Sequence, residues 1–460
     1  MAEAVHLEAR MGDIDALMLR LERSALLRST ILQVALLDAA PDPTRMRAKI
    51  LRGFAQIPRF RQVPVAALLP GVPPTWVTSS NFDIDYHLRF MRLSGRNDMR
   101  ALLDEAARIA MQAFDPARPL WESHVIDGLA DGGAGAIQKI HHSLGDGVSL
   151  LDIILLFVDF ERDPTAPAGD IDELLPEVSS STSRLAQSLA TDARTLGHAM
   201  TGAPRRALRT ARDPAESMKS LVMLSRSLAR LAAPGSGALS PIMKGRSLGA
   251  RFDTLVCPFD KLHAAAKAVG GRLNTALLAA VSGALGRYHE AHGAPVPAVR
   301  CAIPVSTRQG RGGSLGNQFS PTRFLLPTWA ADNVERLEIA RDLTTAQTNE
   351  PALSLAGPVA RVLNTLPSAL IVPVFEHVMR GIDVIVNNLR GSPIELFVAG
   401  ARSLGNYGFS PRGGAAVNIT VISHLDELNF AINSDPAAIP DPDMFVACLR
   451  ESIDDIRKAA

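Results

Sequence analysis

The sequence is poor in cysteine and almost without net charge. Its three cysteines, Cys257, Cys301 and Cys448, lie far apart and outside any C-x-x-C spacing. This argues against a disulfide framework and a structural zinc site, and it fits a reducing, cytoplasmic compartment. The 48 basic and 47 acidic residues give a formal charge of +1. Such a balance argues against a protein built to neutralise phosphates, so we expect no nucleic-acid partner.

Long apolar runs are also missing. The run from Ile153 to Val158 lies between two aspartates and is far shorter than the ~20 residues that span a bilayer. The first residues have neither the basic region nor the apolar region of a secretory signal. We therefore expect a protein that does not cross a membrane, although it can lie against one.

The length of 460 residues predicts more than one domain. Alternating strand and helix patterns occupy residues 1–163 and 248–460, which predicts an α/β domain at each end. Strands are expected at 121–126, 136–142, 250–257, 299–305, 322–326, 384–388, 395–399, 417–423 and 429–434, and helices at 101–112, 148–160, 259–269, 274–288 and 441–458.

Residues 164–247 differ in composition from both ends and predict a partly helical crossover linker. Between Arg184 and Arg230 there are nine basic and three acidic residues, a net charge of +6, with leucine, methionine and valine between them. This pattern is typical of a segment that lies on an anionic membrane or a lipid inclusion. A solvated linker helix explains the same composition, and both interpretations stay open.

The segment from Ile140 to Gly147 reads Ile-His-His-Ser-Leu-Gly-Asp-Gly and lies at a predicted strand-to-helix junction. Neighbouring strand residues point to opposite faces, so only one of His141 and His142 can point into a site. A neutral imidazole with a pKa near ~6.5 can accept a proton from an alcohol. Asp146 follows His142 by four residues, and the nearby glycines permit a backbone tight enough to bring its carboxylate back towards the ring.

Other interpretations of this segment remain. Asp146 can be the N-cap of a helix that begins near Gly147, and the histidines can be hydrogen-bonded polar residues at the end of a strand. A metal site made of His141, His142 and Asp146 is disfavoured, because adjacent strand side chains diverge and no further His/Cys cluster has ligand spacing. We therefore expect no bound metal.

The same segment resembles the HHxxxDG signature of the superfamily of chloramphenicol acetyltransferase-like enzymes and peptide-synthetase condensation domains. Further segments resemble blocks of the bacterial wax ester synthase/diacylglycerol acyltransferase (WS/DGAT) family, in the same order and over nearly the whole chain. These segments are Phe82–His87, Pro119–Glu122, Gly316–Gln318 with Leu326-Pro327, Val417–Ser423 and Ala438–Asp441. Such an ordered set is more specific than HHxxxDG alone.

This resemblance implies a fold and an activity. The fold is α/β (α+β), with two chloramphenicol acetyltransferase-like domains joined by the linker and a site between them. The activity is an acyl transfer of lipid metabolism, from acyl-CoA as co-substrate to diacylglycerol, which gives triacylglycerol, or to a long-chain alcohol, which gives a wax ester. No cofactor is implied.

The resemblance also implies roles for site residues. His142 matches the family's general base, His141 the supporting histidine, and Asp146 the aspartate that holds the motif in shape. Attack on a thioester creates an oxyanion that needs hydrogen-bond donors. Candidates to bind substrate or this oxyanion are Gly147, Asn274, Asn418, Thr420 and Ser423. A plainer interpretation makes Asn274 a helix cap and the later three strand hydrogen-bonding residues.

Two positions depart from the family pattern. Thr275 stands where the family commonly has an aspartate, and the loop Val386–Ser392 differs from the family's proline-rich loop. The missing carboxylate removes a favourable interaction with the helix dipole. Two alternative functions therefore stay in view: a condensation-type acyltransferase fed by a carrier protein, and a non-catalytic lipid-binding homologue.

Overall fold

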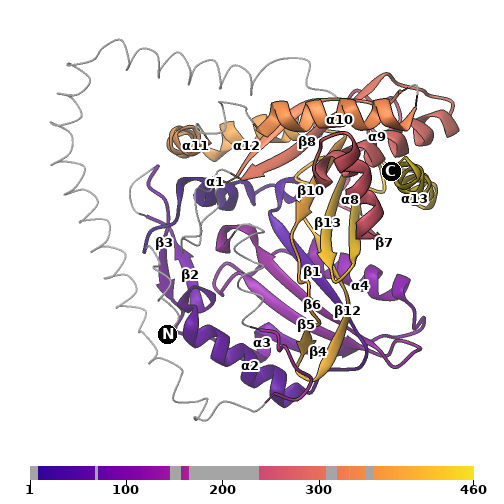
Figure 1. Ribbon diagram of the computed structural model, residues 1–460. Helices are drawn as coiled ribbons and strands as arrows, with labels where there is room; N and C mark the ends of the chain where they lie inside the picture. The colour runs from indigo at the N-terminus through magenta and orange to yellow at the C-terminus, as the bar shows by residue number, and fades with distance from the viewer. Residues whose placement is uncertain are drawn as a thin grey trace.

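The computed structural model describes residues 9–67, 71–145, 157–164, 238–306, 319–330, 332–348 and 356–459. In these parts of the chain two six-stranded sheets form two lobes, each covered by helices (Figure 1). A small third sheet pairs β2 (Gln62–Val65) with β3 (Thr75–Thr78) beside the first lobe. The expected mixed α/β fold with two lobes is confirmed.

The first lobe is built on a sheet with the strand order β11-β12-β1-β6-β5-β4. Its strands are β1 (Thr30–Leu37), β4 (Leu88–Arg92), β5 (Trp121–Asp127), β6 (Ala134–His141), β11 (Phe397–Val398) and β12 (Ala401–Phe409). Antiparallel pairing places β6 between β1 and β5. The predicted hairpin of residues 121–142 is therefore confirmed, except that the second strand ends at His141 and not at His142.

Two helices cover opposite faces of this sheet. Helix α2 (Pro43–Gln56) begins after the N-cap Asp42 and packs Phe54 against the ring of Trp121. Helix α4 (Met99–Met111), predicted at 101–112, packs Leu102 in a second cluster with Ile137. The two clusters take alternate residues of β6, as a strand buried on both sides requires.

The second lobe has the strand order β7-β14-β13-β10-β8-β9. Its strands are β7 (Arg251–Pro258), β8 (Ala298–Ser306), β9 (Phe319–Pro327), β10 (Val384–Leu389), β13 (Val417–His424) and β14 (Glu427–Ser434), and its helices are α8 (Phe259–Ala268), α9 (Leu273–Ala291), α10 (Asn333–Thr348) and α13 (Pro442–Lys458). The predicted strands and helices at these places are confirmed. Apolar residues of α8, α9 and α13 form one core with β13 and β14.

Four further helices complete the first lobe and its border with the second. They are α1 (Asp13–Leu21), α3 (Ile84–His87) and the pair α11 (Ala356–Thr365) and α12 (Ser368–Arg380). No single helix in the described residues is long and apolar enough to cross a membrane. The bent pair α8–α9, with axes 96° apart, has the length and composition of a broken span, and its apolar side chains pack in the second-lobe core.

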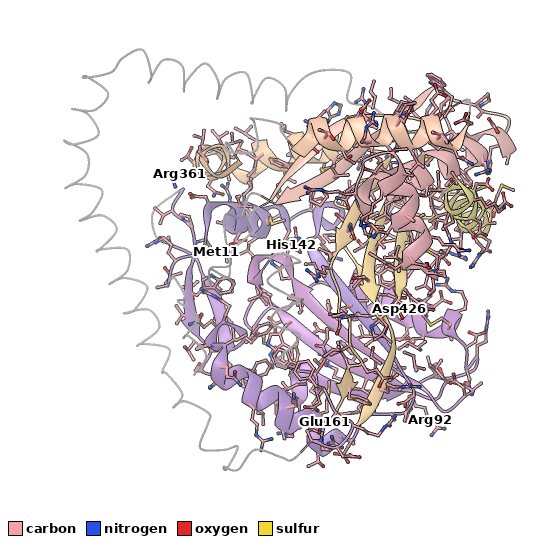
Figure 2. All side chains as sticks on the ribbon, in the orientation of Figure 1. Met11, Arg92, His142, Glu161, Arg361 and Asp426 are labelled. Carbon is pink, nitrogen blue, oxygen red and sulfur yellow. The ribbon has the colours of Figure 1, made fainter. Side chains whose placement is uncertain are left out.

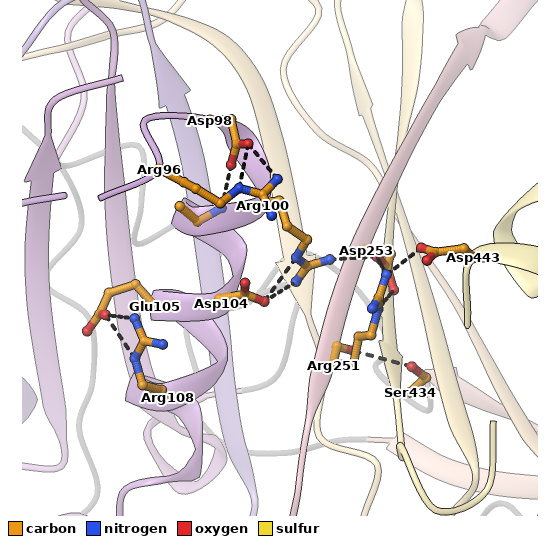
Figure 3. A network of polar contacts seen from close by, with 11 residues as sticks. Arg96, Asp98, Arg100, Asp104, Glu105, Arg108, Arg251, Asp253, Ser434 and Asp443 are labelled. Carbon is orange, nitrogen blue, oxygen red and sulfur yellow. Dashed lines mark hydrogen bonds and ion pairs between the residues drawn. The ribbon is translucent and has the colours of Figure 1, made fainter. Parts of the chain in front are cut away.

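The C-terminal part of the chain contributes strands to the first sheet. Strand β12 comes from the last third of the chain but pairs with β1, with Leu32 opposite Phe409. The first sheet therefore contains strands from both predicted domains, residues 1–163 and 248–460. Ion pairs also join the lobes: Arg100 of α4 and Arg251 of β7 share the carboxylate of Asp253 (Figure 3).

Two predicted elements are wrong in their bounds. The strand expected at 395–399 is only β11, because Ala399 and Gly400 have φ values of 46° and 92° and turn the chain into β12. The helix expected to reach Phe160 does not, because Asp159 forms a bridge with Phe397. The rest of that helix, and the linker up to residue 237, lie outside the described residues.

Candidate active site

The two histidines of the motif lie where β6 ends in the middle of the first sheet. His141 is the last residue of the strand, and His142 begins a 3-10 turn, His142–Leu144. His141 is 1% exposed, whereas His142 is half-buried. The backbone N–H of His142 donates to Ser29 O at 2.8 Å, which fixes the turn against the start of β1. Figure 2 labels His142 on the side of the first lobe nearer to the second.

Both ring nitrogens of His141 have partners. Nδ1 accepts the backbone N–H of Ser143 at 3.1 Å and lies 2.7 Å from Ser143 Oγ. Nε2 lies 3.1 Å from Glu22 Oε1. Because Nδ1 accepts, the hydrogen-bond network assigns the ring proton to Nε2, which lies beside the carboxylate without the geometry of a hydrogen bond to it. His141 therefore supports the turn through its ring.

Glu22 is a site residue that the sequence did not indicate. It is the C-cap of α1, and its Oε1 also accepts the backbone N–H of Ser29 at 2.7 Å. The same carboxylate therefore orients His141 and holds Ser29, whose carbonyl anchors His142. More than a hundred residues separate Glu22 from the motif, so no local pattern could have revealed it.

The other half of the motif is only partly described. Leu144, 1% exposed, packs with Ile140 and the α2 face of the sheet, so the histidine turn lies over that face. Asp146 and Gly147 lie outside the described residues, as does the block Gly316–Gln318. The described residues contain no group of three or more His, Cys, Asp or Glu side chains that could hold a metal.

A buried charge cluster lies on the His141 face of the sheet. Lys139 is directly opposite Glu122 across the hairpin, with Nζ 3.3 Å from Oε1. His124 Nε2 contacts the other oxygen of Glu122 at 3.0 Å. Burial opposes ionisation of Glu122, but the hydrogen bond from His124 and the charge of Lys139 outweigh it and lower the Glu122 pKa to about 2. Burial lowers the pKa of Lys139.

The ring of Phe114 lies between this charge cluster and His141 of the motif. Lys139 Nζ lies 4.4 Å from the centroid of Phe114, and the same ring meets the His141 ring edge-on at 6.1 Å. Glu122 is the last residue of the segment Pro119–Glu122 that resembles a family block. The structure thus gives this block a physical role, which is to supply the buried carboxylate beneath the histidines.

The block Phe82–His87 also meets this segment. The His87 ring stacks between Phe82 and Trp121, with centroids 5.5 and 4.4 Å away. Its Nδ1 lies 2.7 Å from Trp121 O, so Nδ1–H donates to that carbonyl. Burial lowers the His87 pKa to about 4, and the ring is neutral at neutral pH. His87 is a packed structural residue.

Two of the second-half candidates, Asn418 and Thr420, are engaged with their neighbours. Both lie on β13, and Asn387 of β10 donates to Asn418 Oδ1 at 2.6 Å and to Thr420 Oγ1 at 3.1 Å. Thr420 Oγ1 donates in turn to Ser410 Oγ at 3.0 Å. The plainer interpretation of strand hydrogen bonding therefore describes both residues.

The other two candidates, Asn274 and Ser423, bond to the end of β10 and to the loop after it, respectively. Asn274 Oδ1 accepts from Asn388 Nδ2 at 2.7 Å, and Ser423 Oγ accepts from the Gly391 N–H at 3.0 Å. Asn274 is not the helix cap, because α9 begins one residue earlier, at Leu273. Thr275 Oγ1 instead accepts the backbone N–H of Arg272 at 3.3 Å, so the departure at this position still serves the helix start.

Solved structures share this architecture of two lobes. A wax ester synthase/diacylglycerol acyltransferase from Marinobacter aquaeolei VT8 superimposes with a TM-score of 0.63 at 21% identity, over 98% of this chain and 99% of the other. The starter condensation domain of rhizomide synthetase, solved with C8-CoA, gives a TM-score of 0.57 at 15% identity over 98% and 94% of the two chains. The chain therefore has the fold that the WS/DGAT structure and condensation domains share.

Sequence comparison identifies the family within this fold. The wax ester synthase/diacylglycerol acyltransferase catalytic domain matches residues 11–277, and the WS/DGAT C-terminal domain matches residues 315–457. A protein of Mycobacterium tuberculosis strain H37Rv, provisionally named a diacylglycerol O-acyltransferase, is 33% identical over 463 residues, covering 99% of this chain and 93% of the relative. A second H37Rv protein with the same provisional name is 29% identical over 422 residues, covering 87% and 88%. The chain belongs to the WS/DGAT family of acyltransferases.

Proposed function

We propose that the protein transfers an acyl group from acyl-CoA to the hydroxyl of a lipid alcohol, with His142 as the general base. The observation that carries this proposal is the contrast between the two imidazoles. His141 is buried, with a hydrogen bond at Nδ1 and the Glu22 carboxylate beside Nε2, whereas the adjacent His142 is half-buried at the start of its turn. The CoA thioester as donor is supported by the family and by the C8-CoA complex of the condensation domain.

The reaction needs one proton carrier. His142 takes the proton of the acceptor hydroxyl while that oxygen attacks the thioester carbonyl, so no acyl-enzyme forms. Collapse of the tetrahedral species breaks the C–S bond, and the imidazolium returns the proton to the departing CoA thiolate. Glu22 and Ser29 keep the turn in place during these steps, because they hold His141 and the His142 N–H.

The first test removes the base. The variants His142→Ala and His142→Gln should release CoA about 10²- to 10⁴-fold more slowly than wild type, with diacylglycerol and with hexadecanol as acceptors. His263→Gln is the matched control, since His263 is another half-buried histidine, on helix α8 of the second lobe, and it should keep full activity. Undiminished turnover in folded His142 variants would refute the role of His142. Acyl-CoA binding without CoA release by wild type would instead favour the non-catalytic alternative.

For the acceptor we propose diacylglycerol first and a long-chain alcohol second. The names of the relatives favour diacylglycerol. Polar side chains on the α2 face of the first sheet give independent support: Gln33 Nε2 donates to Asn406 Oδ1 at 2.7 Å, and Gln138 Nε2 donates to Ser123 Oγ at 2.8 Å. Gln33 and Gln138 are half-buried, and each keeps a further amide N–H that can donate to an ester carbonyl.

A second test compares the two acceptors in one variant. Gln138→Leu removes a donor from this face, so it should raise KM for diacylglycerol, which has ester carbonyls, by about fivefold or more. KM for hexadecanol, which has none, should stay unchanged. Steady-state CoA release with both acceptors measures the difference. An equal change for both acceptors would contradict recognition of ester groups by this side chain.

A further inference from the structure

Three helices form one corner of the molecule beside the first lobe (Figure 1). Helices α1, α11 and α12 pack through a small apolar cluster of their own, which includes Leu17, Leu363 and Ile371. This cluster is separate from the cores beneath the two sheets. The outer side of the corner is therefore a distinct surface, which we call the α12 face.

The α12 face is apolar where a surface helix is normally polar. Leu370 and Val374 are 61% and 43% exposed and lie four residues apart on one side of α12, and Leu366, 39% exposed, lies in the bend just before the helix. Pro367, Ala369 and Pro373 are exposed beside them. These six neighbouring residues form a continuous apolar stripe and not scattered single side chains.

The exposed ionisable side chains of these helices are all basic. Across residues 12–24 and 356–381 they are Arg23, Arg361, His377 and Arg380. The carboxylates of the same residues are buried or half-buried, namely Asp13, Asp15, Glu22 and Glu376. Arg361 contacts Asp13, yet 74% of its side chain remains exposed, against 18% for the aspartate. The face thus presents apolar and cationic groups together.

The stripe is held in a fixed shape. Arg20 of α1 donates to the carbonyl oxygens of Leu363 and Asn364, at 3.3 and 2.7 Å, and to Ser368 Oγ at 3.2 Å. It therefore closes the end of α11 and the start of α12 with one guanidinium. Glu376 is bonded to Ser24, which fixes the other end of α12. The backbone of this surface is therefore already ordered before it meets a partner.

We propose that the α12 face docks on a lipid surface with anionic headgroups. Apolar side chains can enter the boundary between headgroups and acyl chains while the arginines meet the lipid phosphates. A second copy of the chain fits poorly, because two such faces would bring arginine against arginine without an exposed carboxylate between them. The proposal goes beyond acyl transfer and does not depend on it.

The test measures vesicle binding without turnover. Wild-type protein and Leu370→Glu/Val374→Glu are sedimented with vesicles of phosphatidylcholine alone or mixed with phosphatidylglycerol. The double variant should bind the anionic vesicles at least about tenfold more weakly, because two carboxylates replace the apolar stripe. Phe160→Glu is the control, since Phe160 is 59% exposed and precedes Glu161, which lies far from Arg361 (Figure 2). It should bind as wild type does.

A second pair of variants separates the electrostatic contribution of the arginines from the contribution of the apolar side chains. Arg23→Gln and Arg380→Gln should each weaken binding to anionic vesicles about fivefold at low salt and have little effect at high salt. Three outcomes would overturn the proposal: no binding of wild type to anionic vesicles, equal binding by the Leu370→Glu/Val374→Glu variant, or a loss of self-association in that variant by analytical ultracentrifugation. None of these outcomes bears on the proposed acyl transfer, because the CoA-release assay tests that activity separately.

Discussion

His141 and His142 differ in what surrounds them and not in their chemistry. The motif is local, and strand alternation alone predicted that the two rings would have different environments. Which ring would be held, and by what, depended on Glu22, Ser29 and Phe114, which come from other elements. The sequence therefore indicated the histidine motif as the candidate site, while the side chains that support the motif could be found only in the folded chain.

His87 provides a pH test at the same scale. Its pKa falls from 6.5 to about 4 because it is buried, so between these values the unfolded chain binds a proton that the folded chain does not. Stability should therefore decrease as pH falls through this range, by up to about 3 kcal/mol. His87→Phe keeps a ring between Phe82 and Trp121 but cannot titrate, so it should lose this part of the pH dependence. Urea denaturation at pH 7 and pH 5 measures how the stability of wild type and of His87→Phe changes with pH. An equal change in the two proteins would contradict the lowered pKa of His87.

Among the elements, strands with strong periodicity were predictable and β12 was not. Strands β13 and β14 and helix α13 agree with the sequence expectation within two residues, because apolar side chains recur along them at the proper spacing. Strand β12 contains Gly405, Asn406 and Gly408, residues that disfavour strands. Its pairing with β1 and its packing against β13 outweigh this local preference.

The loop after β10 provides a stability prediction for a single structural element. A Cβ on Gly391 would lie 1.8 Å from the carbonyl oxygen of Ser423, and that backbone atom cannot move aside freely. Gly391→Ala should therefore destabilise the protein by about 2 kcal/mol or more and release the Ser423 hydroxyl from its donor. Gly357→Ala, in helix α11, is the control, because nothing lies within 4 Å of its added Cβ. Equal thermal midpoints for the two variants would show that the loop packs differently.

At the scale of the whole molecule, the lobes are tied by shared charges. Asp253 of β7 accepts Arg100 Nη1 of α4 at 2.7 Å and Arg251 Nε at 3.1 Å, and its side chain is only 11% exposed (Figure 3). Each arginine has a second carboxylate, Asp104 or Asp443. The contact between lobes is therefore a continuous network.

Removing its central carboxylate should weaken the whole molecule. Asp253→Ala leaves two arginines facing one another in a half-buried place, so we expect a loss of about 2 kcal/mol in the free energy of unfolding. Asp443→Ala, at a side chain that is 83% exposed, should change stability by less than about 1 kcal/mol. Chemical denaturation of both variants decides the matter, and a similar loss in both would argue against a special role for Asp253.

The pairing of β12 with the first sheet has a consequence for how the protein is made. Leu32 pairs with Phe409, so the first sheet stays incomplete until nearly the entire chain has left the ribosome. During synthesis β1 is an open edge, able to pair with any neighbouring nascent chain. Production of this protein therefore requires that edge to be shielded for most of translation. A gene shortened before codon 401 yields a product that lacks this pairing permanently.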